Sequence, residues 1–318
     1  MSLQSLLGKY QNKNSSNSNK RPRNDTEKSE KSSTNGNSKT KSTSSTSSSS
    51  SSTQIIKSNQ KSYYKNGEFI DGCITSNGDM AVMGKKSKTD KVSHHGYYRF
   101  YPRYLEHLRP LSVSSGHGML EIGIDQSHSL QMWLDYFPQS FIYGLDIGVE
   151  DQGERYRIFQ ADQSDNSQLK PIIDKKIKHE IFFIIDDGSH IPEHQVSCFD
   201  YLFDALLKPG GTYIIEDIET SYWTKNGLYG YNTSYGYEHE LSCIEIFKQI
   251  ADDVNREFLT SSNREKHDQK MSKYLSTKTR NLISTITFGT NCILVVKKTE
   301  EEHTLFSPDR EYRFRKNL

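Results

Sequence analysis

The sequence lacks the features of membrane-spanning, secreted and zinc-binding proteins. No apolar stretch approaches the ~20 residues needed to cross a membrane, and Met1 to Asn14 has neither the apolar core nor the cleavage site of a signal peptide. The cysteines form no CxxC pair, so neither a zinc site nor a disulfide framework is indicated. They are Cys73, Cys198, Cys243 and Cys292. We therefore expect a cytoplasmic protein with reduced, buried thiols.

Apolar residues are also scarce in the first sixty positions, which are mostly Ser, Asn, Thr and Lys. Such a segment cannot bury enough apolar surface to offset its ordering entropy, so residues 1–60 are expected to form a disordered tail. The tail holds ten Lys and Arg against three Asp and Glu, a net of +7, which leaves 31 against 37 in the rest of the chain. Its KRPR segment at 20–23 faintly resembles a nuclear import signal, but a solvated tail is the favoured interpretation.

From about residue 111 onward, short apolar runs alternate with amphipathic stretches. Strands are expected at 118–124, 141–147, 156–162, 181–187 and 212–217, with a hairpin formed by 283–288 and 292–298. Helices are expected at 129–137, 165–176, 196–207 and 238–259, the third of them ended by the KPGG segment at 208–211. The alternation predicts an α/β fold with a parallel sheet covered by helices on both faces.

Acidic residues lie toward the carboxyl end of each of the five expected parallel strands. They are Glu121, Asp146, Asp162, the pair Asp186 and Asp187, and the pair Glu216 and Asp217. A single acid at a strand end is ordinarily a solvated loop residue or a helix cap, but five strands in succession are not explained in that way. The carboxyl ends of parallel strands meet at one edge of the sheet, where ligands of such folds bind. The crowded carboxylates therefore predict a cation or a hydroxyl-rich ligand at this edge.

The first expected strand does not lead into a dinucleotide-binding loop. Such a loop needs GxGxxG so that the backbone can approach a pyrophosphate, whereas Gly123 is followed here by IDQS. A carboxylate at the end of the second strand, Asp146, can still hold ribose hydroxyls. This combination favours a nucleoside cofactor without a diphosphate.

Several longer segments carry a family resemblance. They include TDKVSHHGYYRFYPRYLEHLR, LEIGIDQSHSLQMW, IIDDGSHI and LKPGGTYIIEDIETSYW, within about Thr89 to Lys298. The chain resembles the class I S-adenosylmethionine-dependent methyltransferases, and more narrowly the metal-dependent sugar O-methyltransferases of the mycinamicin and macrocin type, with the related cephalosporin-hydroxylase-like proteins. The resemblance implies a Rossmann-like methyltransferase domain, which we place at 111–300. We expect a helical extension at 61–110 before it, a C-terminal tail at 301–318 after it, and a lid at about 221–240 within it.

The resemblance also implies residues that bind the cofactor, S-adenosyl-L-methionine. Glu121 and Gly123 would lie beside its methionine part. Asp146 would accept hydrogen bonds from the ribose, and Asp162 with Gln163 would lie near the adenine. The usual third glycine of this loop is Ser127 here, which makes the affinity for the cofactor uncertain without changing the expected fold.

The same resemblance implies a Mg²⁺ site and a general base. Asp187, Glu216 and Asp217 match the metal ligands of the macrolide enzymes, and His190 matches their general base. Asp186 is expected to support the strand end or to contact the cofactor. Mg²⁺ prefers oxygen ligands and acidifies a substrate hydroxyl, and an imidazole can then remove the proton. The alternative for His190 is a cap on the following helix.

Aromatic residues gather on either side of this domain. Tyr97, Tyr101, Tyr104 and Leu108 have helical spacing and are expected to pack against the domain or against a second subunit, which leaves a homo-oligomer open. Lys91, His94 and His95 precede this stripe and are candidates for a contact with substrate or cofactor. The tyrosine-rich segment at 221–240 suits a lid that stacks on sugar rings, or else an ordinary surface loop.

The interpretation that agrees best with these features is a Mg²⁺-assisted O-methyltransferase acting on a small hydroxylated molecule, a sugar-bearing compound or a polyol, in natural product biosynthesis. A catechol-like diol acceptor and a non-catalytic S-adenosylmethionine-binding protein remain as alternatives. A nucleic-acid substrate is disfavoured because basic patches with interleaved aromatic residues are absent from the acidic body.

Overall fold

The structure is a computed structural model that describes residues 64–65, 68–69, 78–110, 116–225 and 232–305. The expected tail at 1–60 and Cys73 lie outside these residues, as do the middle of the expected lid and most of the expected C-terminal tail. No helix among the described residues is both long enough and apolar enough to span a membrane.

An eight-stranded sheet organises the described part of the chain, in the order β5-β6-β4-β3-β7-β8-β10-β9. Its strands are β3 (His117–Ile122), β4 (Phe141–Asp146), β5 (Asp151–Gln152), β6 (Tyr156–Gln160), β7 (Glu180–Asp186), β8 (Leu207–Glu216), β9 (Ile283–Gly289) and β10 (Cys292–Lys297). The five central strands from β6 to β8 pair in parallel, whereas β5, β9 and β10 are antiparallel to their neighbours. The expected parallel sheet with a C-terminal hairpin is confirmed. A separate two-stranded hairpin pairs β1 (Tyr64–Lys65) with β2 (Glu68–Phe69).

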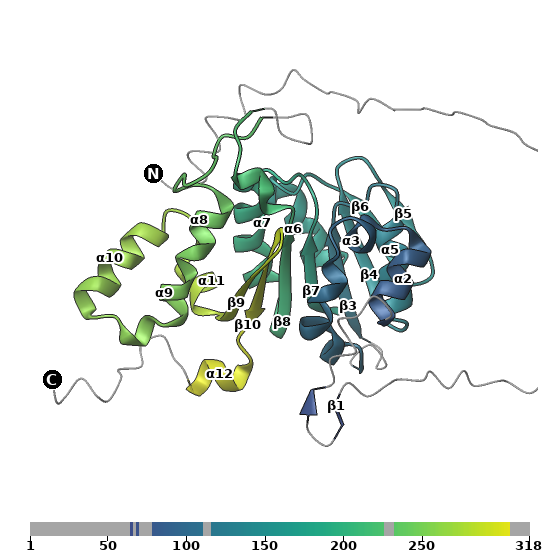
Figure 1. The fold of residues 1–318 in the computed structure, drawn as a ribbon, viewed down its shortest axis with the longest axis horizontal. Coiled ribbons are helices and arrows are strands. Elements are labelled where there is room, and N and C mark those ends of the chain that lie inside the picture. The colour runs from purple at the N-terminus through teal and green to yellow at the C-terminus, as the bar shows by residue number, and fades with distance from the viewer. Residues whose placement is uncertain (1–63, 66–67, 70–77, 111–115, 226–231, 306–318) are drawn as a thin grey trace, which may run out of the picture.

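Two apolar clusters lie on opposite faces of the sheet, because successive side chains of a strand point to opposite sides. Leu120, Ile184 and Ile215 belong to the cluster covered by α6 (Asn166–Lys175), α7 (Pro192–Ala205) and α8 (Cys243–Lys248). Met119 and Ile185 belong to the cluster covered by α2 (Asp79–Ser87) and α5 (His128–Tyr136). Figure 1 shows α2 and α5 at one side of the molecule and α8 at the other.

The remaining helical elements flank this core. They are α3 (Asp90–Ser93), η2 (Tyr97–Arg99), α4 (Pro102–Leu105), η3 (Glu106–Leu108), η5 (Ile218–Ser221), α9 (Ile250–Val254), η6 (Arg256–Phe258), α10 (Ser261–Met271), α11 (Thr277–Asn281) and α12 (Glu300–Leu305). In Figure 1 the helices α9, α10 and α11 lie beyond the β9 edge of the sheet. The short elements from α3 to η3 belong to the second cluster.

The tyrosine stripe packs into the core as expected, but not as one helix. Tyr97 and Tyr101 have no exposed surface, and Leu108 is 5% exposed. The stripe is divided among η2, α4 and η3, and α4 begins at Pro102. Proline is favoured at the start of a helix and breaks a continuous one, which explains the division.

Two expected boundaries were wrong. The KPGG segment at 208–211 does not end a helix but forms a bulge within β8, since Ile181 pairs with Leu207 and Phe183 with Thr212. The expected helix at 238–259 begins at Cys243, where Ser242 caps it, and is interrupted at Gln249 before α9 ends at Val254. Strand pairing and capping outweigh local propensity in both places.

A buried lysine joins β10 to the end of α7. Lys297 is 6% exposed, and its Nζ donates to the carbonyls of Phe203 at 2.7 Å and Leu207 at 2.6 Å. Lys297→Met is expected to lower the free energy of unfolding by about 1–3 kcal/mol, because it leaves buried carbonyls without a donor. Chemical denaturation measures this. Lys278→Met at an exposed position is the control, and an equal loss in both variants would contradict the assignment.

Candidate active site

A lysine and three carboxylates meet at the carboxyl ends of β3, β7 and β8. Lys91 Nζ lies 2.5 Å from Asp187 Oδ2, 2.6 Å from Glu216 Oε2 and 3.5 Å from Glu121 Oε1. The side chains of Lys91, Glu121 and Glu216 are each at most 1% exposed. The acids expected from strand ends are therefore brought together, around a lysine that the sequence marked only as a candidate contact.

The charges in this cluster shift one another's ionisation. Burial alone would lower the pKa of Lys91, but the carboxylates of Asp187 and Glu216 raise it well above its ordinary value. Burial raises the pKa of Glu121 to about 7, against the opposing effect of the Lys91 ammonium. Lys91 is thus held as a cation, and the buried acids are stabilised by it.

Two tyrosines and an asparagine hold the acidic pair at the end of β8. Tyr101 Oη donates to Glu216 Oε1 at 2.7 Å, and Tyr97 Oη donates to Asp217 Oδ1 at 3.0 Å. Asn291, in the turn between β9 and β10, also donates to Asp217 Oδ1 at 3.0 Å. Burial raises the pKa of both tyrosines well above the ordinary range, so the hydroxyls remain protonated donors.

Asp187, His190 and Asp217 form the most open part of the site. Each offers one ligand atom, and these atoms lie within 4.8 Å of one another. His190 Nε2 is 3.8 Å from Asp217 Oδ2, and His95 Nδ1 is 3.6 Å from Asp217 Oδ1. Carboxylate oxygens beside an imidazole can hold a hard divalent cation. Glu216, the third expected metal ligand, lies behind them with its two oxygens on Lys91 and Tyr101.

Both His190 and Asp217 have left-handed backbones, each with a φ of +54°. Side chains other than glycine rarely adopt this region, and such strain is concentrated at functional sites. Asp217 follows the last residue of β8 and precedes η5, while His190 lies between β7 and α7. The strained turns place both side chains at the end of the sheet.

The loop after β3, which we expect to contact the cofactor, packs closely against the loop after β7. Gly123 has a φ of +83°, and a Cβ there would lie 2.1 Å from the carbonyl oxygen of Asp187, so only glycine allows the two loops to touch. Glu121 Oε1 accepts a hydrogen bond from Trp133 Nε1 at 3.1 Å. Its Oε2 is buried and makes no hydrogen bond within the described part of the chain. A buried carboxylate oxygen in this position suits an amino group of a ligand.

Two expected cofactor residues, Asp146 and Asp162, lie at the carboxyl ends of the outer parallel strands β4 and β6. Asp146 Oδ2 accepts from the backbone amides of Ile124 at 2.9 Å and Asp125 at 3.2 Å, so it stabilises the loop after β3. Asp162 Oδ1 accepts from both the backbone and the hydroxyl of Ser164. Asp146 ends β4, and Asp162 follows β6 by two residues, at the edge of the sheet expected for a nucleoside.

Asp186 and Gln163 bond to each other beneath the surface. Gln163 Nε2 donates to Asp186 Oδ1 at 3.0 Å, and Gln163 Oε1 accepts from the amide of Ser189 at 2.6 Å. Burial raises the pKa of Asp186 to about 6. Asp186 was expected either to support the strand end or to contact the cofactor. Its hydrogen bond with Gln163 is a contact of the first kind.

Two exposed aromatic rings come from the segment that follows the acidic pair in the chain. Tyr222 and Tyr237 stack with centroids 6.0 Å apart and are 46% and 64% exposed. They belong to the segment expected to act as a lid, whose residues 226–231 lie outside the described part of the chain. Exposed stacked tyrosines can contact sugar or aromatic rings.

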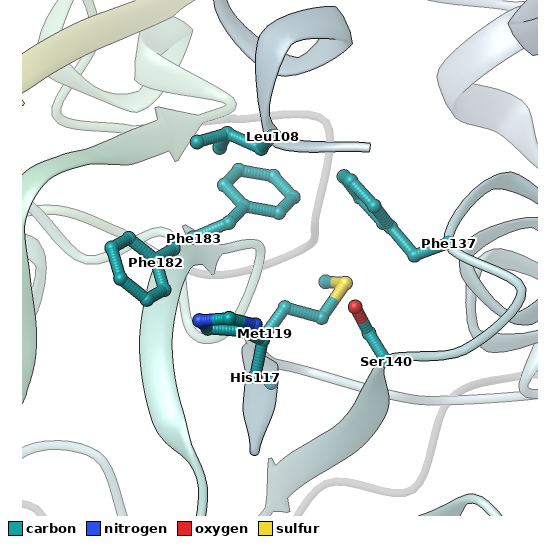
Figure 2. Close-up of a pocket in the computed structure, with 8 residues that line it drawn as sticks. Leu108, His117, Met119, Phe137, Ser140, Phe182 and Phe183 are labelled. Carbon is teal, nitrogen blue, oxygen red and sulfur yellow. The ribbon is translucent and has the colours of Figure 1, made fainter. Parts of the chain in front are cut away.

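A pocket elsewhere in the molecule is too small for a cofactor. Figure 2 shows it between Leu108, Met119, Phe137 and Phe183, with His117 and Ser140 at the opposite end from Leu108. It lies at the starts of β3 and β7, at the opposite end of these strands from the acids. Its volume of about 10 Å³ admits about one water molecule.

No family model matches the chain, but known proteins are similar to it in sequence and in fold. The demethylmacrocin O-methyltransferase of Streptomyces fradiae is 32% identical over 200 residues, which are 60% of this chain and 48% of that protein. The mycinamicin VI 2''-O-methyltransferase of Micromonospora griseorubida is 35% identical over 164 residues, which are 48% and 39% of the two chains.

A comparison with solved structures finds the same kind of enzyme as the comparison of sequences. A structure of the MycE methyltransferase from the mycinamycin biosynthetic pathway, in complex with Mg and SAH, has a TM-score of 0.57 and 28% identity. The match covers 70% of this chain and 55% of that chain. In sequence and in fold, this chain resembles the class I S-adenosylmethionine-dependent methyltransferases. It spans about half the length of these sugar O-methyltransferases, or less.

Ser127 stands where the loop of methyltransferases of this type usually has glycine. Its backbone conformation is one that favours glycine. Its φ is +65°, immediately before α5. Ser127→Gly is expected to raise the free energy of unfolding by up to about 1 kcal/mol, because glycine adopts this conformation without strain. Denaturant unfolding measures the change. Gln131→Gly, within the same helix, should lower stability by about 1 kcal/mol, and a loss in both variants would contradict the assignment.

Proposed function

We propose that this chain is an S-adenosyl-L-methionine-dependent, Mg²⁺-assisted O-methyltransferase that acts on a hydroxyl of a sugar-bearing or polyol small molecule. The observation that carries the proposal is the meeting of Asp187, His190 and Asp217 beside a cofactor loop of the methyltransferase type. Similarity to sugar O-methyltransferases of antibiotic pathways supports the choice of acceptor.

The residues at the open part of the site fit a Mg²⁺ ion. Asp187 and Asp217 supply hard oxygen donors, and the left-handed turn at Asp217 holds its carboxylate at the end of the sheet. We assign Asp187, Glu216 and Asp217 to the ion, as the sequence predicts, with Glu216 also bound to Lys91. A bound cation would offset the repulsion among these carboxylates and acidify a substrate hydroxyl.

The residues around β3 and β4 fit the cofactor. We assign the amino group of the methionine part to the buried Oε2 of Glu121, and the close approach of the loops to Gly123. Asp146, Asp162 and Gln163 are assigned to the ribose and adenine side. S-adenosyl-L-methionine would supply the methyl group, and the chain's part is to orient it toward the acceptor oxygen.

Proton removal is assigned to His190. A sugar hydroxyl is a very weak acid, so a base must take its proton as the methyl group is transferred. His190 Nε2 lies 3.8 Å from Asp217 Oδ2, so a substrate oxygen near Asp217 is within reach of the imidazole. The exposed rings of Tyr222 and Tyr237 would pack against the acceptor's sugar or polyketide part.

A catechol-like diol is the second candidate acceptor. Two adjacent phenolic oxygens present the same chelating geometry to a divalent cation as two adjacent sugar hydroxyls. A panel of acceptors tests the choice: glycosylated polyketides of the kinds named for the relatives, simple catechols, and a buffer blank, each with labelled cofactor. Transfer to catechols but to none of the glycosides would overturn the sugar assignment.

Asp217→Asn tests the metal. Asparagine tolerates the left-handed backbone, so the variant removes charge while keeping the turn. Turnover should fall at least about 100-fold and EDTA should abolish it in the wild type, while the Kd for S-adenosylhomocysteine by calorimetry stays within about threefold. The exposed Asp252→Asn is the matched control. EDTA-resistant turnover would show that methyl transfer is metal-independent and that this part of the proposal is wrong.

His190→Asn tests the base, again with a side chain that accepts the left-handed turn. Its kcat should fall by about 10²–10⁴-fold, with the Kd for S-adenosylhomocysteine unchanged. His95→Asn is measured in parallel, because His95 is the other imidazole near Asp217. A larger loss in His95→Asn than in His190→Asn would move the base to His95.

A further inference from the structure

The candidate active site contains a cation that belongs to the chain, the ammonium of Lys91. Lys91 comes from the short helix α3, outside the Rossmann-like sheet, and reaches the carboxyl ends of three strands. Its side chain is 1% exposed. Within the described part of the chain, its ammonium forms ion pairs with Glu121, Asp187 and Glu216.

Two of these carboxylates are shared with the proposed metal. Lys91 Nζ donates short, charge-assisted hydrogen bonds to Asp187 Oδ2 at 2.5 Å and to Glu216 Oε2 at 2.6 Å. The other oxygen of Glu216 accepts from Tyr101. A divalent ion that binds Asp187 or Glu216 must therefore share the carboxylate with an ammonium only a few ångströms away.

Two cations at that separation repel each other strongly, and burial weakens the screening. Without the ammonium, however, three carboxylates would be gathered with little solvent around them and no compensating charge. The lysine therefore has two opposite effects. It stabilises the acids in the absence of a divalent ion, and it reduces the gain when such an ion binds.

We propose that Lys91 is a built-in cation that competes with the divalent ion for Asp187 and Glu216. It assembles the acidic site before the ion arrives and sets the affinity for that ion low enough for exchange. This inference rests on the proposed function, because it concerns the ion assigned there. A lysine with a purely structural role would affect folding stability without changing the affinity for the ion.

The experiment measures Mn²⁺ binding by electron paramagnetic resonance of free Mn²⁺ and by calorimetry, with no substrate and no turnover. The wild type, Lys91→Met and Lys91→Arg are compared, with Lys297→Met as the control for loss of a buried lysine outside the site. Lys91→Met is expected to bind Mn²⁺ at least about tenfold more tightly than the wild type. Lys91→Arg keeps the charge, and Lys297→Met leaves the site intact, so both should remain within about threefold of the wild type.

Thermal unfolding gives a second measurement on the same proteins. Lys91→Met should unfold at a lower temperature than the wild type in EDTA and should gain more from saturating Mn²⁺ than the wild type does. If Lys91→Met is recovered only in unfolded form, refolding in Mn²⁺ but not in EDTA supports the proposal. If Lys91→Met refolds in neither condition, Lys91→Gln, which also removes the charge, is measured in its place. A Kd of Lys91→Gln for Mn²⁺ equal to that of the wild type overturns the proposal.

The outcomes separate this inference from the proposed function. A folded Lys91→Met protein with the wild-type Kd, or a weaker one, overturns the role of Lys91 and leaves the metal assignment in place. A wild type that binds no Mn²⁺ while Lys91→Met does bind it supports the role of Lys91 and overturns the metal-assisted reaction. Absence of Mn²⁺ binding in both proteins overturns both.

Discussion

The compensation of buried negative charge is the constraint on which this structure depends. A parallel sheet directs the ends of β3, β7 and β8 to one place, and this chain puts acids at each of them. Carboxylates without counter-charge or donors would not stay in the low-dielectric end of the sheet. The counter-charge comes from the ammonium of Lys91. The hydrogen-bond donors are the hydroxyls of Tyr97 and Tyr101 and the amide of Gln163.

Most of this compensation comes from the segment before the sheet. The elements from α3 to α4 contribute the lysine and both tyrosines, and the rings of Tyr97 and Tyr101 stack with centroids 4.8 Å apart. The N-terminal extension is thus a part of the site as well as a part of the core. One set of aromatic residues packs beneath the sheet ends and presents polar atoms to the acids.

The sequence predicted the parallel strands well because each is a short apolar run with an acid at or near its carboxyl end. It predicted that Glu121, Asp187, Glu216 and Asp217 would meet, since the carboxyl ends of parallel strands share an edge. It could not predict that Lys91 would lie among them, because that contact joins residues 96 and 125 positions apart and leaves no periodic signal. Nor could it predict the bulge at 208–211, where pairing with β7 overrides the helix-ending character of proline and glycine.

The left-handed turns at His190 and Asp217 limit how this site can change over time. A lineage that no longer needs chemistry could replace either residue by asparagine or glycine and keep its fold, because these residues accept the backbone. Replacement by valine or isoleucine would strain the turn, so such a change would lower the stability of the fold as well as the activity. Descendants of this chain that have lost catalysis but kept the sheet should therefore carry asparagine or glycine at these two positions.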